Sequence, residues 1–156
     1  MVNSTLCYIQ RRGEYLMLHR VKKENDINKD KWIGIGGKLE EGESPFDCVL
    51  REAREETGLR LIDPEYRGLV TFTDCTGYTE QMHLFTCQRF EGELSECDEG
   101  ELEWVEISLI ESLPIWQGDK LFLSLLSGGE PFFSLKLSYC GDRLAGAWLN
   151  GKELKI

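Results

Sequence analysis

The sequence has no apolar run approaching the roughly 20 residues that a membrane-spanning helix requires, and this absence argues against an integral membrane protein. Its first ten residues, MVNSTLCYIQ, contain no basic segment followed by a long apolar stretch, which is the pattern of a secretory signal peptide. We therefore expect a cytoplasmic protein that makes no contact with a membrane.

Metal-binding cysteine patterns and an excess of basic charge are also missing. The six cysteines form no CxxC pair or His-Cys cluster, so a zinc site is not expected, and reduced, mostly buried thiols are the default in a cytosolic chain. Asp and Glu outnumber Lys and Arg by 28 to 18, which gives a net charge of −10 and argues against binding to a nucleic-acid polymer. A small anionic substrate stays compatible with this charge if a metal ion screens it.

The length and the hydrophobic content suit an ordinary globular domain. The chain has 156 residues, of which 41% are hydrophobic and 29% charged, enough to bury a core without disulfide cross-links. No linker, internal repeat or low-complexity tract divides the sequence. We expect one domain over residues 1–156, present as a monomer or a weak dimer.

One amphipathic helix is predicted after residue 44. Ser44, Pro45 and Asp47 form the pattern of an N-cap, a proline in the first helical position and a first-turn carboxylate, and Gly58 is a typical C-terminal stop. The apolar residues between them recur with helical spacing and predict a stripe that faces the core: Phe46, Val49, Leu50 and Ala53.

Three glutamates lie beside this apolar stripe. At roughly 100° per residue, Glu52, Glu55 and Glu56 fall within an arc of about 100°, while Arg51 is expected to point elsewhere. Crowded carboxylates repel one another, and the repulsion is relieved by a proton, a basic partner or a hard divalent cation such as Mg²⁺. The alternative is a solvated helix face that neighbouring arginines screen.

The segment before the helix favours the metal-binding interpretation. Gly36 and Gly37 open a glycine-punctuated loop that delivers backbone carbonyls and Glu43 to the start of the helix. Glu43 follows Gly37 after five residues, and REAREETGL at 51–59 follows Glu43 after seven more. This arrangement matches the Nudix box at every fixed position. The chain therefore resembles the Nudix hydrolases. The flanking segments WIGIGGK, CDEGELEWV and LPIWQGD make it similar to the MutT-type oxidised purine nucleoside triphosphatases of that superfamily.

This resemblance implies metal-dependent hydrolysis of a diphosphate that is linked to another moiety. The cofactor is expected to be Mg²⁺, with Mn²⁺ as the alternative, and the implied protein ligands are Gly37, Glu52, Glu55 and Glu56. Glu55 and Glu56 are the main implied ligands, and Glu52 is expected to act either as a ligand or as the general base. Arg51 is expected to orient the glutamates, and these four residues form the implied catalytic set.

Two box residues have implied structural roles, and one further ligand is implied outside the box. Glu43 is expected to brace the loop, and Gly58 to end the helix. In the family a glutamate from a later loop often completes the metal shell, and here Glu99 is the expected residue, with Glu96 as the alternative.

The implied substrate is a small nucleotide, 8-oxo-dGTP or a related oxidised purine nucleoside triphosphate, which would yield the monophosphate and pyrophosphate. Arg20 and Lys23 could contact phosphate, or could simply make their loop soluble. The resemblance places the base against Trp116, Asp119, Phe72 and Met82, with Thr5 on the pocket floor, although each of these residues could also be plain core or a first-turn residue. Ile33 departs from the mammalian enzymes of this group, which have an asparagine that contacts the purine at this position.

Two other functions stay open. The first is hydrolysis of another diphosphate, such as ADP-ribose, a nucleotide sugar or a capped RNA end, because the box selects the chemistry and the flanking segments select the substrate. The second is a non-catalytic nucleotide-sensing domain, against which the intact carboxylate set argues.

The expected fold class is α/β, a Nudix-type α/β/α sandwich with a mixed β-sheet and a C-terminal β-hairpin. An N-terminal hairpin is predicted from Thr5–Gln10 and Glu14–Val21, followed by an exposed loop at 22–31 and a short strand at 32–37. The remaining predicted elements are strands at 66–73, 81–88 and 102–106, helices at 108–112 and 116–126, and a terminal hairpin of 132–139 with 143–149.

Overall fold

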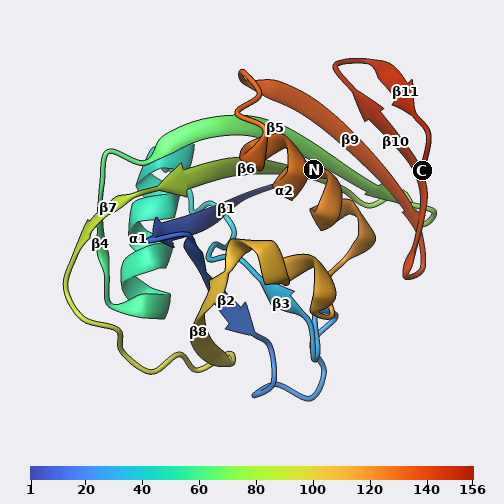
Figure 1. Ribbon diagram of the computed structural model, residues 1–156. Coiled ribbons are helices and arrows are strands. Elements are labelled where there is room, and N and C mark those ends of the chain that lie inside the picture. The colour runs from blue at the N-terminus through green and yellow to red at the C-terminus, as the bar shows by residue number, and fades with distance from the viewer.

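A mixed nine-stranded β-sheet forms the centre of the protein, and helices lie against both of its faces (Figure 1). The computed structural model describes residues 1–156. The helical elements are α1 (Pro45–Thr57), the 3-10 helix η1 (Ile107–Ser112) and α2 (Gln117–Ser127). The strands are β1 (Val2–Arg11), β2 (Glu14–His19), β3 (Trp32–Ile33), β4 (Arg60–Ile62), β5 (Glu65–Asp74), β6 (Thr79–Cys87), β7 (Arg89–Glu91), β8 (Glu101–Glu106), β9 (Phe133–Cys140), β10 (Arg143–Leu149) and β11 (Lys152–Leu154). The expected α/β sandwich with C-terminal strands is confirmed.

Strand β1 joins the two halves of the sheet. The strand order is β11-β10-β9-β5-β6-β1-β2-β3, with β8 also paired to β2, while β4 and β7 form a separate two-stranded sheet. The predicted N-terminal hairpin is present, but β1 pairs with β2 only beside the turn, from Gln10↔Tyr15 to Arg11↔Glu14. Over Val2 to Ile9, β1 instead runs parallel to β6. The second strand ends at His19 and not at Val21, because the chain turns away there into the 22–31 loop.

Alternation along the strands builds two separate cores, one on each face of the sheet. On β1, Leu6 and Tyr8 belong to the core under α2, whereas Cys7 and Ile9 belong to the core under α1. This is the pattern expected of a strand that is covered on both sides, because successive side chains point to opposite faces. The sheet therefore separates the α1 side of the molecule from the α2 side.

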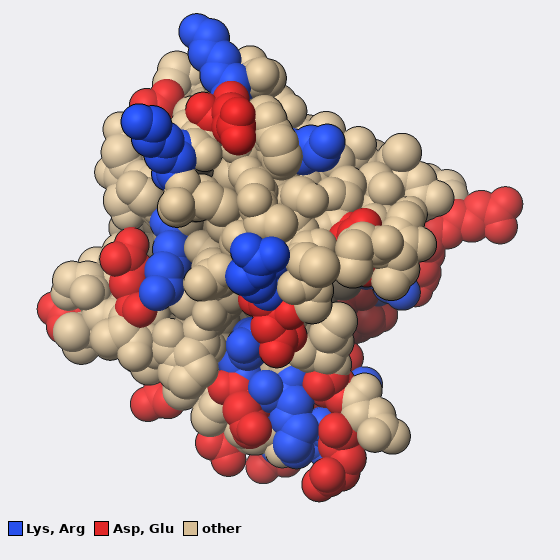
Figure 2. Space-filling model, turned by 90° about the vertical axis from the view of Figure 1, so that its right-hand side faces the viewer, with Lys and Arg blue, Asp and Glu red and all other residues tan.

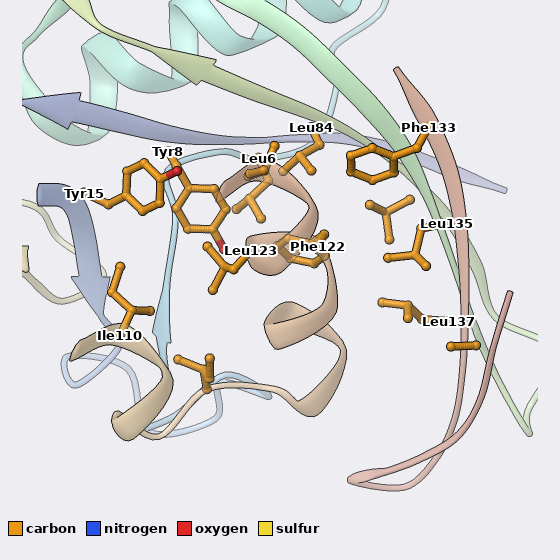
Figure 3. Packing of buried hydrophobic residues seen from close by; sticks show 14 of the residues in the cluster. Leu6, Tyr8, Tyr15, Leu84, Ile110, Phe122, Leu123, Phe133, Leu135 and Leu137 are labelled. Carbon is orange, nitrogen blue, oxygen red and sulfur yellow. The ribbon is translucent and has the colours of Figure 1, made fainter. Parts of the chain in front are cut away.

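The α2 side holds the larger core. Figure 3 shows Phe122 and Leu123 of α2 lying among Tyr8 and the β9 side chains Leu135 and Leu137. Phe122 and Leu126 of α2 are buried, while Leu121 and Leu125 pack against the core and stay partly exposed. Fully burying one such side chain contributes about 1.5–3 kcal/mol. Neither α1 nor α2 is long and apolar enough to span a bilayer.

The predicted core-facing stripe of α1 is only half correct. Val49 and Ala53 are buried, but Phe46 and Leu50 are 44% and 39% exposed. Buried positions of the helix also include Cys48, Glu56 and Thr57, so the helix is rotated relative to the predicted apolar face. This rotation turns a carboxylate toward the protein interior.

The segment between β3 and α1 runs along β1 without forming the continuous strand predicted at 32–37. Only Trp32 and Ile33 are in a strand, and Ile35 and Lys38 then make isolated antiparallel bridges to β1. The glycines explain the short distance between the two chains. A Cβ on Gly36 would lie 1.9 Å from the Thr5 carbonyl oxygen. The absence of a side chain at Gly36 thus lets β1 approach this segment closely.

Replacing Gly36 with alanine should lower the free energy of unfolding by about 3 kcal/mol, because the added methyl group meets rigid backbone and forces β1 away from this segment. Urea denaturation measures the change. Gly128→Ala is the matched control, since Gly128 has a φ of −78° and its added Cβ would have an ordinary 3.4 Å contact. Equal midpoints for Gly36→Ala and the wild-type protein would show that the close approach is not structurally required.

Candidate active site

The acidic helix begins with a fully capped turn. Ser44 is the N-cap, and its hydroxyl accepts a hydrogen bond from the Asp47 amide at 3.1 Å, while the Asp47 carboxylate accepts one from the Ser44 amide at 2.9 Å. Gly58 ends the helix in the left-handed conformation, with φ 78°. The capping predicted from sequence is confirmed at both ends. Because both termini are fixed, the carboxylates of α1 are held at defined positions on the helix.

Arg51 is the centre of the acidic cluster. Its Nε and Nη2 donate to both carboxylate oxygens of Glu43, at 2.7 and 2.9 Å. Its Nη1 donates to Glu52 at 2.8 Å and to Glu55 at 3.1 Å, and Nη2 also reaches the Lys38 carbonyl at 3.1 Å. The helix-geometry prediction that Arg51 points away from the glutamates is wrong, because its long side chain folds back across the helix surface.

The ion pairs of Arg51 keep Glu43 ionised. Hydrogen bonds from Arg51, and from the Glu40 amide at 2.7 Å, lower the pKa of Glu43 to about 2. Glu43 thereby links the 38–43 loop to α1, in the position expected for a bracing residue. The pKa of Arg51 is raised by the same pairing with Glu43, and it stays protonated.

Glu56 is the buried acid of the cluster, with 9% of its surface exposed. It accepts a hydrogen bond from the Gly36 amide at 3.2 Å. Burial raises the pKa of Glu56 well above its usual value, and the nearby carboxylates of Glu99 and Glu52 raise it further. Ionisation of Glu56 is therefore disfavoured, and Arg51 makes no ion pair with this residue that would offset the effect.

Glu52 lies against the backbone of Gly37. A Cβ on Gly37 would come within 2.5 Å of the Glu52 carboxyl carbon, so a side chain here would force this carboxylate to move. Burial raises the pKa of Glu52, and the hydrogen bond from Arg51 acts in the opposite direction. Glu55 lies at the outer edge of the cluster, with 60% of its side chain exposed.

Glu99 comes to this cluster from the loop that precedes β8. It lies close enough to Glu56 to raise that residue's pKa, whereas Glu96 is exposed. Arg20 donates to Glu99 at 2.8 Å and Lys23 donates to it at 3.3 Å. The two basic residues proposed for phosphate contact are thus paired with an acid at the edge of the cluster.

Asp26 was not foreseen as part of this arrangement. Arg20 also pairs with Asp26, whose side chain is 5% exposed, at 2.6 Å. Asp26 lies in a polar, aperiodic loop, and nothing in the sequence marks it as buried. The loop occupies the lowest part of the molecule in Figures 1 and 2, where basic and acidic side chains lie side by side and form no continuous basic surface on the face shown.

The donor chemistry of the cluster fits a hard divalent cation. All of its donors are oxygens, from the carboxylates of α1, from Glu99 and from the Gly37 backbone, and such oxygens are the ligands that Mg²⁺ and Mn²⁺ prefer. As they lie, no three acidic, histidine or cysteine side chains are close enough together to hold a metal ion. Arg51 holds Glu52 and Glu55, and Arg20 with Lys23 holds Glu99. Metal binding at this site therefore requires side chains to exchange these partners for the ion.

The proposed base-contacting residues gather on the α2 side of the sheet. Phe72, Met82 and Trp116 all pack against the larger core, and Asp119 lies in the first turn of α2. Thr5 is separate from them. Its side chain lies toward α1, with its hydroxyl 3.3 Å from the Cys48 sulfur, because odd-numbered residues of β1 face that side. The sequence expectation of Thr5 on the floor of this pocket is not met.

Trp116 is held by three residues that the sequence analysis did not single out. Its indole Nε1 donates to Asn28 at 2.7 Å, Lys31 Nζ lies 4.7 Å from the ring centroid, and Tyr139 meets it edge-on at 5.5 Å. Tyr139 also accepts a hydrogen bond from the Gly118 amide at 2.8 Å. The only available signal was the alternation of β9, which places Tyr139 on the inner face with Leu137.

Asp119 has an unusual environment for a carboxyl group. Burial raises its pKa to about 7, and Lys31 lowers it in part. The same carboxylate contributes to the raised pKa values of Tyr8 and Tyr139, for which burial is the largest cause. Tyr8 is completely buried and its hydroxyl has no hydrogen-bond partner. An acid near half-ionisation at neutral pH thus lies among aromatic residues at the start of α2.

Comparison with known proteins identifies the family. The profile of the NUDIX domain matches residues 2–126. The chain is 34% identical over 131 residues to an uncharacterised Nudix hydrolase, YvcI, of Bacillus subtilis, which covers 81% of this chain and 79% of that protein. It is also 34% identical over 106 residues to the oxidized purine nucleoside triphosphate hydrolase of Danio rerio, which covers 67% of each chain.

Solved structures agree with the sequence comparisons. The crystal structure of a MutT protein from Bacillus halodurans superposes with a TM-score of 0.86 at 26% identity, covering 97% of this chain and 99% of that one. The family predicted from the box at residues 37–59 is therefore confirmed. The chain belongs to the Nudix family and is a hydrolase that acts on pyrophosphate bonds.

Proposed function

We propose that this protein hydrolyses oxidised purine nucleoside triphosphates such as 8-oxo-dGTP to the monophosphate and pyrophosphate, in a reaction that requires Mg²⁺ or Mn²⁺. The observation that carries the proposal is a set of four neighbouring carboxylates. Arg51 holds Glu52 and Glu55, and Glu99 lies close enough to Glu52 and Glu56 to raise the pKa of both. The names of the curated relatives from Danio rerio and Mus musculus, both oxidized purine nucleoside triphosphate hydrolases, support the substrate class.

The carboxylates and one backbone carbonyl would hold the metal. Glu55 and Glu56 are the main proposed ligands, and the Gly37 carbonyl and Glu99 would complete the oxygen set. When bound, a divalent ion neutralises charge on the reacting phosphate and lowers the pKa of a water molecule. Release of Glu52 from Arg51 would leave its carboxylate free either to bind the ion or to accept the proton of the attacking water.

The basic residues at the edge of the cluster would receive the phosphate chain. Arg20 and Lys23 are already held beside Glu99, so an incoming phosphate would find two cations next to the carboxylate set. Arg51 is proposed to keep its contacts with Glu43 while the other glutamates exchange partners, because that pair uses both carboxylate oxygens. The loop from Lys38 to Glu43 would thus stay fixed during turnover.

The base would be recognised on the α2 side of the sheet, opposite the carboxylate cluster of α1. Trp116 offers an aromatic face, and stacking of a base on such a face is worth roughly 1–3 kcal/mol. Asp119 offers oxygen acceptors for purine N–H donors in a partly buried environment, where such bonds are stronger than in water. Because Ile33 has no hydrogen-bonding group, Asp119 would provide more of the polar recognition than in the mammalian enzymes.

Ile33 also favours a second candidate within the same chemistry. An apolar residue at this position suits a nucleotide whose base is not read there, as in ADP-ribose or a nucleotide sugar. A screen of 8-oxo-dGTP, the normal nucleotides, ADP-ribose and nucleotide sugars, with Mg²⁺ and with Mn²⁺, separates the two when chromatography measures the loss of substrate and the formation of the nucleoside monophosphate. If kcat/KM is highest for ADP-ribose or a nucleotide sugar, the proposed substrate class is wrong, while the assignment of the carboxylate site still stands.

Turnover should require a divalent cation, and Glu56→Gln and Glu55→Gln should each lower kcat by at least ~100-fold, because each removes a charged ligand that stabilises the transition state. Steady-state kinetics with and without EDTA test this, and circular dichroism confirms that the variants fold. Glu41→Gln is the matched control and should keep wild-type kcat. Glu41 is an exposed glutamate in the loop from Lys38 to Glu43, before α1. Near-normal turnover by folded Glu56→Gln and Glu55→Gln would place the metal site elsewhere.

The products should be the nucleoside monophosphate and pyrophosphate, since this is the cleavage that the MutT-type assignment implies. Ion-exchange chromatography of a partly completed reaction identifies them. Pyrophosphatase should be left out of this assay, so that any inorganic phosphate comes from the first cleavage. If a diphosphate and inorganic phosphate appear first, the MutT-type assignment fails.

Asp119 should set the preference for the oxidised base. Because its pKa is about 7, the group loses its proton between about pH 6 and 8. The carboxylate accepts hydrogen bonds from purine N–H groups better than the protonated acid does. The ratio of kcat/KM for 8-oxo-dGTP to that for dGTP should therefore rise with pH across this window in the wild-type protein.

Two variants test the base assignment. In Asp119→Asn the same ratio should be lower and independent of pH, because the amide does not titrate. Trp116→Ala should raise KM for both nucleotides, since stacking does not distinguish them. An unchanged ratio in Asp119→Asn would show that other residues discriminate between the bases.

A further inference from the structure

Two of the six cysteines differ from the others in exposure and spacing. Cys75 and Cys140 are exposed, whereas the remaining four are buried, as expected for most thiols of the chain. The two sulfurs lie 3.7 Å apart, although 65 positions separate the residues in sequence. Neither residue belongs to the carboxylate cluster or to the proposed base site.

The sheet register places this pair at directly opposite positions. β5 and β9 run parallel and pair residue by residue from Gly68↔Phe133 to Asp74↔Tyr139. Cys75 and Cys140 are the next residue on each chain. Neighbouring strands lie about 4.8 Å apart, which falls within the roughly 4.4–6.8 Å that a disulfide allows between Cα atoms. The two turns lie together at the right-hand end of the sheet in Figure 1.

Both cysteines stand on ordered turns. The Asp74 carboxylate accepts hydrogen bonds from the amides of Thr76 and Tyr78, at 2.8 and 3.1 Å, which closes the turn after β5. The turn after β9 contains Gly141 in the left-handed conformation, with φ 61°. The short sulfur–sulfur distance therefore belongs to two fixed positions of the backbone.

We propose that Cys75 and Cys140 form a redox modification site, at which a hydroperoxide converts the two thiols into an intramolecular disulfide. The Cys75 thiolate attacks one peroxide oxygen, the O–O bond breaks, and Cys75 becomes a sulfenic acid as water leaves. The Cys140 sulfur then attacks the Cys75 sulfur, the S–O bond breaks, and a second water leaves with the Cys140 proton. Two thiols and one hydrogen peroxide give one disulfide and two waters.

The order of attack follows from the hydrogen bond between the sulfurs. The Cys140 S–H donates to the Cys75 sulfur, so Cys75 is the acceptor and the better-placed nucleophile. This bond raises the pKa of Cys140 and keeps it protonated until the second step. The disulfide would tie the end of β9, directly after Tyr139, to the end of β5.

Mass spectrometry and thiol titration of the full-length reduced protein test the site, with hydrogen peroxide as the probe. The native reduced protein should show two fast-reacting thiols, and after oxidation it should show none and a mass lower by two hydrogen atoms. Peptide mapping should join Cys75 to Cys140, and dithiothreitol should reverse the change. The melting temperature should rise by roughly 5 to 15 °C, because the cross-link closes a long loop in the unfolded chain.

Ser138→Cys/Cys140→Ser is the matched control, since it keeps a thiol on the same face of β9 but moves it out of register with Cys75, to the position opposite Thr73. This variant should form no intramolecular cross-link and should show no rise in melting temperature after peroxide treatment. Cross-linking of the control to the same extent as the wild-type protein, a stable sulfenic or sulfinic acid at Cys75, or a disulfide only between two molecules would each overturn the proposal. These readouts do not depend on the nucleotide that the protein hydrolyses.

Discussion

The arrangement of the carboxylate cluster depends on the guanidinium of Arg51. A planar group with five donors can bind both oxygens of Glu43 and still reach Glu52, Glu55 and the Lys38 carbonyl. A lysine ammonium could not make these contacts in the same directions. Because one cation satisfies a loop acid and two helix acids at once, the loop and α1 are joined by charge-assisted hydrogen bonds. The attraction of these glutamates to Arg51 offsets the repulsion among them and holds them close together.

The second constraint is the close approach of three stretches of backbone. The Gly36 amide binds the Glu56 carboxylate, the Thr5 amide donates to the Gly37 carbonyl at 2.8 Å, and Glu52 fills the space that a side chain on Gly37 would occupy. These contacts connect β1, the 34–38 segment and α1. The fold and the carboxylate cluster thus rest on the same positions, and a side chain at Gly36 would disturb both.

What the sequence could predict follows the range of the interactions. The N-cap and the C-cap of α1 depend on residues within a few positions of each other, and both predictions were correct. The parallel pairing of β1 with β6 and of β5 with β9 depends on contacts between distant segments, for which a single sequence contains no direct signal. The exposure of Phe46 and the direction of Arg51 were wrong for the same reason. Helical spacing states which residues share a face, but the neighbouring elements decide which face is buried.

The same sheet separates the proposed metal-binding side from the proposed base-binding side. Alternate residues of β1, β2 and β6 face the carboxylate helix and the α2 core, so the two sides share the strands at the centre of the sheet. Changes around Trp116 and Asp119 can therefore alter the α2 side without moving Arg51 or its glutamates. Ile33 lies in the 32–37 segment, next to the backbone that leads to Gly37. Ile33 packs against the core on the α1 side, so the residue at this position is constrained by that packing as well as by the proposed nucleotide. The box from Gly37 onward does not depend on which residue occupies position 33, and it is matched at every fixed position.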